Sequence, residues 1–294
     1  MTARSKKRLM LIASGALLLL GVVAIQLPSI GAALILHPVH RHVVATPPNM
    51  CQKVTFNGDG VSLQGWRGQG SGSHRGTLIY LHGVSDNRAS GAGVMERYRK
   101  RGFDVVAYDS RAQGESGGDV STYGYYEKED LRRVMDTVAP GPIVLVGTSF
   151  GAAVALQAAA IDRRISAVVA AETFSDLRTV LTERAPFFFT PGTIDRAIRL
   201  AEQKGHFQLD AVSPTLAART ITAPVLLVHG ALDSATKPDH SRRVLAALAG
   251  PKRLILVSGA GHNESLRGNV WEDIDRWLDS VLSTKPDGDP TTDE

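Results

Sequence analysis

Residues 141–160 read GPIVLVGTSFGAAVALQAAA, and the fold predicted for this chain follows from them. The first part is a short apolar run rich in β-branched residues, which is typical of a buried strand. The last part consists almost entirely of good helix formers. Between them lies the pattern G-x-S-x-G, with Ser149 at its centre. The stretch therefore predicts a strand that turns sharply into a helix, with a serine at the corner.

The geometry of this turn explains why both flanking positions of the pattern are glycine. The serine of a nucleophile elbow adopts strained backbone angles, and the helix after it passes close to neighbouring strands. A side chain at Gly147 or Gly151 would collide there. The turn would hold the Ser149 hydroxyl at the carboxyl end of the sheet, beside the Phe150 amide at a helix N-terminus. The motif in this context predicts a nucleophilic serine.

Length and composition exclude several classes of protein. The chain has 294 residues, enough for one α/β domain with insertions. Its formal net charge is only +4, and part of this charge lies at the extreme N-terminus, so no nucleic-acid-binding stripe is indicated. The single cysteine, Cys51, excludes an internal disulfide and a cysteine-based metal site. The nine histidines show no metal-ligand spacing. We expect neither a metal nor a nucleic-acid partner.

Residues 1–36 have the pattern of a membrane-targeting segment. Four basic residues precede Leu9–Ile25, which carries no charge, and apolar residues resume through Ile30–Leu36. A run of this length exceeds the ~20 residues that cross a bilayer. Basic residues before such a run stay in the cytoplasm. We therefore expect a transmembrane anchor, a membrane partner and a catalytic domain on the extracytoplasmic side.

A cleaved signal peptide is the alternative for this segment, and it would make the protein secreted. Gly31-Ala32-Ala33 offers a small-residue cleavage site. We favour the uncleaved anchor because the apolar run continues past that site. Residues 37–53 contain two proline-bearing turns and are expected to form a linker. Residues 284–294 lack apolar side chains, so we expect a disordered tail.

Strands and helices alternate along residues 54–283, the expected catalytic domain. It begins with a hairpin, because two alternating runs flank Asn57–Gly60. The alternation of strands and helices after the hairpin predicts a mostly parallel central sheet with helices on both faces. Ligands of such sheets bind at the carboxyl ends of the strands. We expect further strands at 77–81, 103–108, 167–171, 224–228 and 253–257, and helices at 91–101, 127–138, 241–248 and 270–282.

The alternation breaks at about residues 172–222. This region holds two expected helices, 175–183 and 193–204, around a segment with three consecutive phenylalanines. We interpret it as a small helical cap over the active site. The sequence leaves three roles open for Phe187, Phe188 and Phe189: lining an acyl pocket, touching a bilayer, or packing the cap onto the body.

Two residues after later strands complete a catalytic triad with Ser149. A serine hydroxyl needs a base, and the base needs an acid that fixes its tautomer. In this type of fold the chain order is Ser, acid, His. His262 follows the last strand in a loop of small residues, and Asp233 follows the preceding strand. We expect these two as base and acid, with Glu172 and Asp176 as rival acids.

An oxyanion hole needs two backbone N–H groups, one after the nucleophile and one from an early strand-to-helix loop. Phe150 would supply the first. Val84, which follows His82-Gly83, would supply the second. His82 itself is expected to hold the geometry of that loop, and the sequence assigns no role to His229 or His240.

Taken together, the motifs resemble the α/β-hydrolase superfamily, and within it the serine aminopeptidase-like group. The resemblance covers residues 54–283 and departs from the usual D-x-R-G-x-G only at Ala112. It implies an α/β-hydrolase fold and hydrolysis of ester, thioester or amide bonds without a cofactor. The motifs that carry it are Gly58–Trp66, His82-Gly83 with Asn87, Asp109–Gly114 with Ser116, Gly147–Gly151, Ser213-Pro214, Pro224–Asp233 and Gly261-His262.

The function expected from the sequence is that of a serine hydrolase that forms an acyl-enzyme with a small-molecule or acyl ester substrate. One alternative is a non-catalytic binding protein of the same fold. An intact triad argues against it, because a scaffold has no need for all three groups. The other is a cofactor-free acyltransferase or haloperoxidase that uses the same triad. It differs only in what reacts with the acyl-enzyme, and the sequence does not separate it from a hydrolase.

Overall fold

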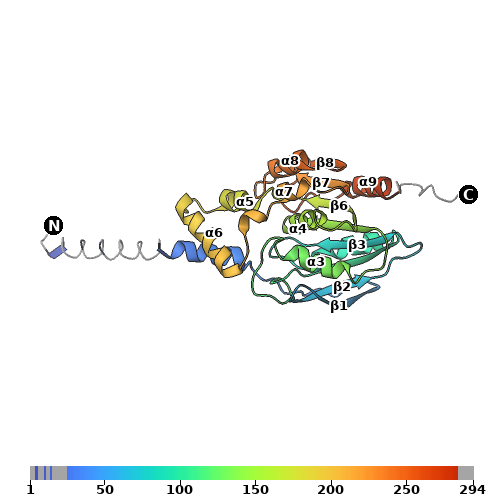
Figure 1. The fold of residues 1–294 in the computed structure, drawn as a ribbon, viewed down its shortest axis with the longest axis horizontal. Helices are drawn as coiled ribbons and strands as arrows, with labels where there is room; N and C mark the ends of the chain where they lie inside the picture. Colours follow the sequence, from blue (N-terminus) through green and yellow to red (C-terminus); the bar gives the residue numbers. More distant parts are fainter. Residues whose placement is uncertain (1–3, 6–9, 11–13, 15–24, 284–294) are drawn as a thin grey trace, which may run out of the picture.

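An eight-stranded sheet forms the centre of the computed structural model, which describes residues 4, 5, 10, 14 and 25–283. The strand order is β1-β2-β4-β3-β5-β6-β7-β8 (Figure 1). The strands are β1 Cys51–Asn57, β2 Ser62–Gly68, β3 Gly76–Leu81, β4 Phe103–Tyr108, β5 Ile143–Thr148, β6 Ile165–Ala171, β7 Val225–Gly230 and β8 Lys252–Val257.

The sheet is mostly parallel, which confirms the prediction. β1 and β2 form an antiparallel hairpin, and β2 pairs antiparallel with β4. Every other neighbouring pair, from β4–β3 to β7–β8, runs parallel. The hairpin is longer than the sequence pattern indicated, since its pairing starts at Cys51 and Gly68.

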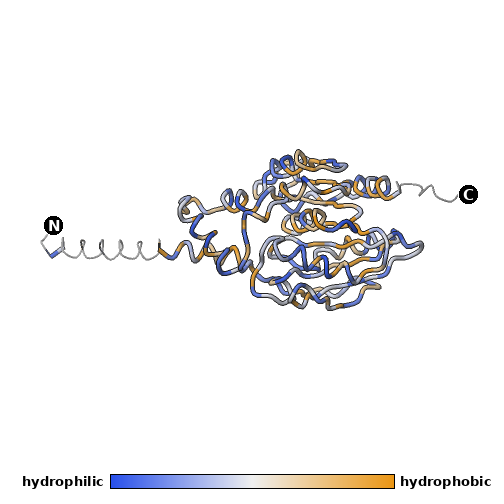
Figure 2. Tube along the Cα trace, viewed as in Figure 1, coloured by the Kyte–Doolittle hydropathy of each residue, from blue (hydrophilic) through white to orange (hydrophobic). Residues whose placement is uncertain are grey.

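Helices cover both faces of the sheet because side chains of the buried strands alternate between two apolar layers. In β5, Leu145 faces one layer, while Val144 and Val146 face the other. The first layer also contains residues of α3 Glu127–Met135, α4 Phe150–Ala159 and α8 Pro238–Ala247. The second contains residues of α2 Ala92–Arg99 and α9 Val270–Ser283. Figure 2 shows the apolar segments gathered in the strands and helices of the body.

Between β6 and β7 the chain leaves the sheet and forms the helices of the expected cap. Asp176 caps α5 through the Thr179 N–H, and Thr190 caps α6 through the Thr193 N–H, so each helix begins at a good N-cap. Figure 1 shows α6 beside the N-terminal helix, at the end of the molecule away from α9. The elements of this region are α5 Leu177–Arg184, α6 Pro191–Gly205, η2 Leu209–Ala211 and α7 Pro214–Ala218; one further short helix, η1 Arg88–Gly91, precedes α2.

The prediction of a transmembrane helix is wrong. Among the described residues, no helix is both long enough and apolar enough to cross a membrane. The helix over residues 25–36 packs against the cap instead, and Ala32, Ile35 and Leu36 are buried in one cluster with Ile198 of α6 and Leu177 of α5. The second half of the predicted anchor therefore buries one apolar side, with Ala32, Ile35 and Leu36, inside the folded domain, while Ile30 and Leu34 stay exposed.

The predictions that depended on this anchor are corrected with it. They are the membrane partner, the extracytoplasmic domain and the alternative of secretion. The proposed cleavage site, Gly31-Ala32-Ala33, lies within the packed helix, where Ala32 is fully buried. Most of residues 9–24, and the predicted tail at 284–294, lie outside the described residues.

Candidate active site

The elbow after β5 has the strained geometry that the sequence predicted. Ser149 is the N-cap of α4 with φ 50° and ψ −113°, a conformation that few residues other than glycine adopt. A Cβ on Gly147 would lie 2.4 Å from the Gly151 carbonyl oxygen, and one on Gly151 would lie 2.2 Å from the Leu81 carbonyl oxygen. Both glycines are therefore required by close backbone approach.

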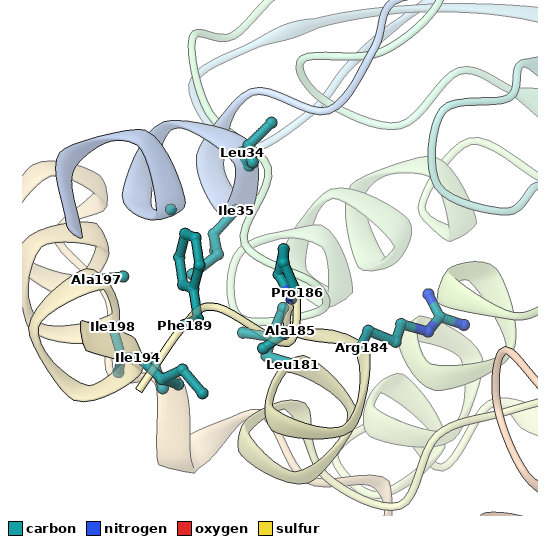
Figure 3. A pocket seen from close by; sticks show the side chains of 11 residues that line it. Leu34, Ile35, Leu181, Arg184, Ala185, Pro186, Phe189, Ile194, Ala197 and Ile198 are labelled. Carbon is teal, nitrogen blue, oxygen red and sulfur yellow. The ribbon is translucent and has the colours of Figure 1, made fainter. Parts of the chain in front are cut away.

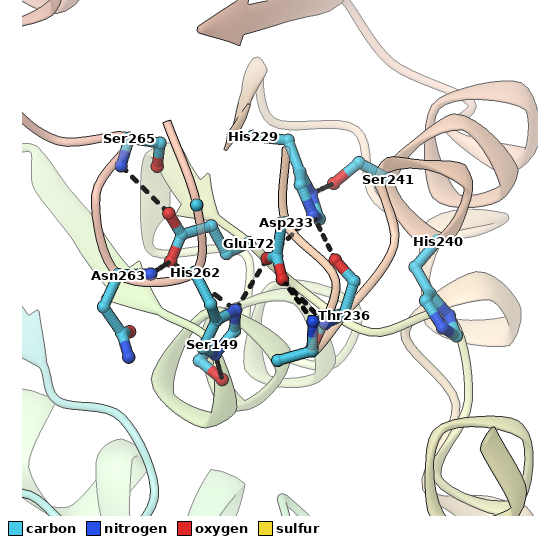
Figure 4. A network of polar contacts seen from close by, with 12 residues as sticks. Ser149, Glu172, His229, Asp233, Thr236, His240, Ser241, His262, Asn263 and Ser265 are labelled. Carbon is cyan, nitrogen blue, oxygen red and sulfur yellow. Dashed lines mark hydrogen bonds and ion pairs between the residues drawn. The ribbon is translucent and has the colours of Figure 1, made fainter. Parts of the chain in front are cut away.

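Ser149, His262 and Asp233 form one chain of hydrogen bonds (Figure 4). Nε2 of His262 lies 3.1 Å from Ser149 Oγ, and its Nδ1 lies 2.6 Å from Asp233 Oδ2. A carboxylate only accepts, so Nδ1 carries the proton and Nε2 is left to accept from the serine hydroxyl. The loops after β5, β7 and β8 thus bring together the three residues that the sequence selected.

Asp233 is held as a buried carboxylate. Its Oδ1 accepts from the N–H groups of Ala235 at 2.9 Å and Thr236 at 2.8 Å. Burial by itself would raise the pKa of Asp233, but hydrogen bonds from His229, His262 and the Thr236 N–H outweigh it and hold the pKa well below its usual range. Asp233 is therefore charged at neutral pH and can stabilise a protonated His262.

His229 supports this acid, a role that the sequence analysis missed. It is fully buried at the end of β7. Its Nε2 donates to the Thr236 carbonyl at 2.8 Å and lies 3.3 Å from Asp233 Oδ2, while its Nδ1 lies 2.7 Å from Ser241 Oγ. The spacing His229-x-x-x-Asp233 at a strand end was the available signal. His229 fixes the loop that presents Asp233.

Neither rival acid binds the catalytic histidine directly. Glu172 lies 3.9 Å from His262 Nδ1, compared with 2.6 Å for Asp233. The buried Glu172 carboxylate instead accepts from backbone N–H groups of the histidine loop, at Asn263, at Glu264 (3.1 Å) and at Ser265 (3.0 Å). Asp176 caps α5. Glu172 therefore positions the loop that carries His262.

Among the described residues, Glu172, Asp233 and His262 are the candidate ligands for a metal ion. Their ligand atoms lie within 4.8 Å of one another. Their oxygens already accept from backbone N–H groups or from His262, as described above, and His262 Nε2 faces Ser149. These hydrogen bonds account for the close approach of the three side chains, and we assign no metal to them.

The two residues expected to supply the oxyanion donors, Phe150 and Val84, both lie near Ser149. Phe150 is the first residue of α4, where the backbone N–H has no partner within the helix. Val84 lines the same cavity as Ser149 and His262. The preceding His82 is buried, and burial lowers its pKa, so it is neutral. It donates from Nδ1 to the Gly83 carbonyl at 2.7 Å, and its Nε2 accepts from the Ser110 N–H at 3.0 Å, which fixes this loop.

The cavity over Ser149 has a volume of about 240 Å³, and two of its lining residues are arginines that the sequence analysis missed. Arg184 comes from the end of α5. Arg41 comes from the segment expected to be a linker, and Asn87 Nδ2 donates to its backbone carbonyl at 3.1 Å. No sequence signal linked a segment before the first strand to the catalytic loops.

Comparison with known proteins gives a consistent result. A sequence model described as the alpha/beta hydrolase family matches residues 78–279. The uncharacterized protein YqkD of Bacillus subtilis is 29% identical over 225 residues, covering 70% of this chain and 73% of YqkD.

Two solved structures illustrate the similarity of fold. The Pyrococcus furiosus esterase Pf2001 has a TM-score of 0.64 at 23% identity, covering 84% of this chain and 97% of the esterase. The Pyrococcus horikoshii acylaminoacyl peptidase has a TM-score of 0.63 at 15% identity, covering 81% of this chain and 43% of the peptidase. At these identities the likeness establishes the fold alone.

Proposed function

The chain belongs to the alpha/beta hydrolase family, and we propose that it is a serine hydrolase that cleaves ester or thioester bonds through a covalent acyl-enzyme. One observation carries the proposal: Ser149, His262 and Asp233 are joined by hydrogen bonds of 3.1 Å and 2.6 Å in the order that nucleophilic catalysis requires. The solved relatives that share the fold include an esterase and an acylaminoacyl peptidase, which favours acyl-transfer chemistry.

In the first half of the proposed reaction, Ser149 Oγ attacks the substrate carbonyl carbon and His262 Nε2 accepts the hydroxyl proton. The carbonyl oxygen becomes an oxyanion that receives hydrogen bonds from the N–H groups of Phe150 and Val84. As the tetrahedral intermediate collapses, His262 returns the proton to the leaving oxygen or sulfur. The alcohol or thiol departs and the acyl group stays on Ser149.

In the second half, water replaces the leaving group. His262 accepts a proton from the water as its oxygen attacks the acyl carbon, and then returns that proton to Ser149 Oγ. The products are a carboxylic acid and the free enzyme. Asp233 stabilises the positive charge on His262 in both halves. An acyltransferase would follow the same first half and use an acceptor other than water in the second.

Labelling with a fluorophosphonate probe tests the nucleophile, and hydrolysis of p-nitrophenyl acetate tests the reaction. We expect the purified protein to be labelled and to release nitrophenolate, and we expect the Ser149→Ala protein to do neither while melting at a similar temperature. A wild-type protein that is folded but neither labelled nor active would instead favour a non-catalytic binding protein. An amide analogue of the same acyl group then measures whether amides are also cleaved.

A further inference from the structure

A second cavity lies between the N-terminal helix and the cap (Figure 3). It has a volume of about 160 Å³ and is lined mainly by apolar side chains from four segments. Leu34 and Ile35 come from the helix over residues 25–36, Leu181 from α5 and Ile194 from α6, and Phe189 comes from the loop between α5 and α6. Of the residues that line it, Arg184 alone is charged. Its chemistry suits a hydrocarbon chain.

Arg184 joins this cavity to the catalytic one, because it lines both. In Figure 3 its side chain leaves the apolar wall and carries the guanidinium away from Leu181 and Phe189. The guanidinium donates to the Ala235 carbonyl at 2.7 Å and to Thr236 Oγ1. These two residues follow the catalytic Asp233. The methylene stem of Arg184 therefore offers an apolar surface between the two cavities.

We propose that this cavity binds the acyl chain of the substrate, so that the enzyme acts on esters or thioesters of medium-chain fatty acids. The proposal rests on the serine hydrolase function given above. The acyl carbon would sit at Ser149 and the chain would pass along the Arg184 stem into the cavity. Each methylene removed from water there should raise kcat/KM about fourfold until the cavity is full.

The N-terminal helix is then part of the substrate site. Gly31 lies so close to α6 that a Cβ on it would be 2.8 Å from Ala197 Cβ and 3.0 Å from the Phe189 ring. This close contact fixes the helix against the cap, and Leu34 and Ile35 form one wall of the cavity. The segment before the first strand therefore contributes to the choice of acyl chain.

A pair of variants on this helix tests the proposal with p-nitrophenyl acetate, butyrate and octanoate. Leu34 is 65% exposed and lines the cavity, whereas Ile30 is 47% exposed on the same helix and does not line it. Both positions should accept aspartate without unfolding. We expect Leu34→Asp to lower kcat/KM for octanoate roughly tenfold or more, because a charge beside the chain opposes its burial. The readout is the octanoate-to-acetate ratio of kcat/KM, which Leu34→Asp should lower because the acetyl group does not reach the cavity, and which Ile30→Asp should leave as in the wild type.

The phenylalanine triplet supplies a second pair. Phe189 lines the cavity, while Phe187 is 99% exposed and does not. We expect Phe189→Ala to enlarge the cavity and move the preferred substrate from octanoate toward dodecanoate, and Phe187→Ala to leave the preference unchanged. Thermal melting of each variant checks that it is folded.

The outcomes separate this inference from the function on which it rests. A wild-type enzyme that hydrolyses acetate but gains nothing from longer chains overturns the acyl site alone. The same holds if Leu34→Asp and Ile30→Asp have equal octanoate-to-acetate ratios. A wild-type protein inert toward every ester overturns the proposed function as well.

Discussion

Asp233 Oδ2 lies 2.6 Å from Nδ1 of His262, at the end of a loop whose backbone N–H groups also bind the carboxylate. Glu172 comes within 3.9 Å of the same nitrogen, but its oxygens are directed to the amides of the loop that carries the histidine. The two buried acids thus have different structural roles. Asp233 orients the imidazole ring of His262, and Glu172 holds the backbone of the loop that carries it.

This division predicts different costs for two isosteric changes. Asp233→Asn should lower kcat roughly 10⁴-fold, because the amide no longer stabilises the protonated histidine or selects its tautomer. Glu172→Gln should lower kcat by between about ten- and a hundredfold, through a displaced histidine loop. Steady-state kinetics on the same ester compares them. A larger loss in Glu172→Gln than in Asp233→Asn would make Glu172 the triad acid.

Ser149 and His262 should behave as one unit. His262→Ala should cost about as much kcat as Ser149→Ala, and the double variant should be no slower than either single variant, because neither group can act without the other. Residual hydrolysis above the uncatalysed rate would come from the oxyanion donors. Single-turnover rates on an activated ester check this. If the losses multiply, His262 acts outside the nucleophile's mechanism.

The catalytic loops could be predicted because each carries a local signal. The strand, the G-x-S-x-G turn and the helix around Ser149 are contiguous in the sequence, and Asp233 and His262 each follow an apolar strand. Parallel strands bring such loops to one edge of the sheet, so the three residues meet without any knowledge of tertiary contacts.

The N-terminal segment could not be predicted in this way. The apolar side chains of Ile35 and Leu36 suit a bilayer and the side of α6 equally well, and hydropathy does not distinguish the two. The supporting roles of Glu172 and His229 were missed for a related reason. Each acts on a loop from another part of the chain or on backbone atoms, and a sequence pattern records neither.

A buried ion pair outside the catalytic cavity should matter for stability. Arg88 and Asp109 are almost fully buried and form a salt bridge, and Asp109 also accepts from the backbone N–H groups of Arg88 at 2.7 Å and Glu115 at 2.8 Å. Asp109→Ala should lower the free energy of unfolding by about 3–5 kcal/mol, because it removes the buried partner of Arg88 and leaves this buried guanidinium paired only with the half-exposed carboxylate of Glu115.

The matched control for this change is Asp239→Ala. Asp239 pairs with Arg243 on the surface of α8, where both side chains are about half exposed. Loss of this ion pair should lower the free energy of unfolding by less than about 1 kcal/mol. Urea denaturation of both variants measures the difference. Equal losses would show that the Arg88–Asp109 pair contributes no more than a surface pair.

Stability should fall in mildly acidic solution because of buried neutral histidines. Burial holds the pKa of His82 below its ordinary value of 6.5, and burial also lowers the pKa of His240. Below pH 6.5 the unfolded chain therefore binds protons that the folded protein does not, so the free energy of unfolding decreases as pH falls toward the folded-state pKa. Protonation of His82 Nε2 would also set two N–H groups, its own and that of Ser110, against each other.

Replacing His82 with a residue that does not titrate removes its share of this pH dependence. The quantity to measure is therefore the slope of the free energy of unfolding against pH. We expect wild-type protein to lose up to about 1.4 kcal/mol per pH unit for each such histidine as pH falls below 6.5 toward the folded-state pKa. His82→Gln should be less stable at neutral pH, since it disturbs the loop before Val84, yet its slope should be flatter. Urea denaturation at several pH values gives the two slopes, and an unchanged slope in His82→Gln would mean that folding does not lower the pKa of this histidine.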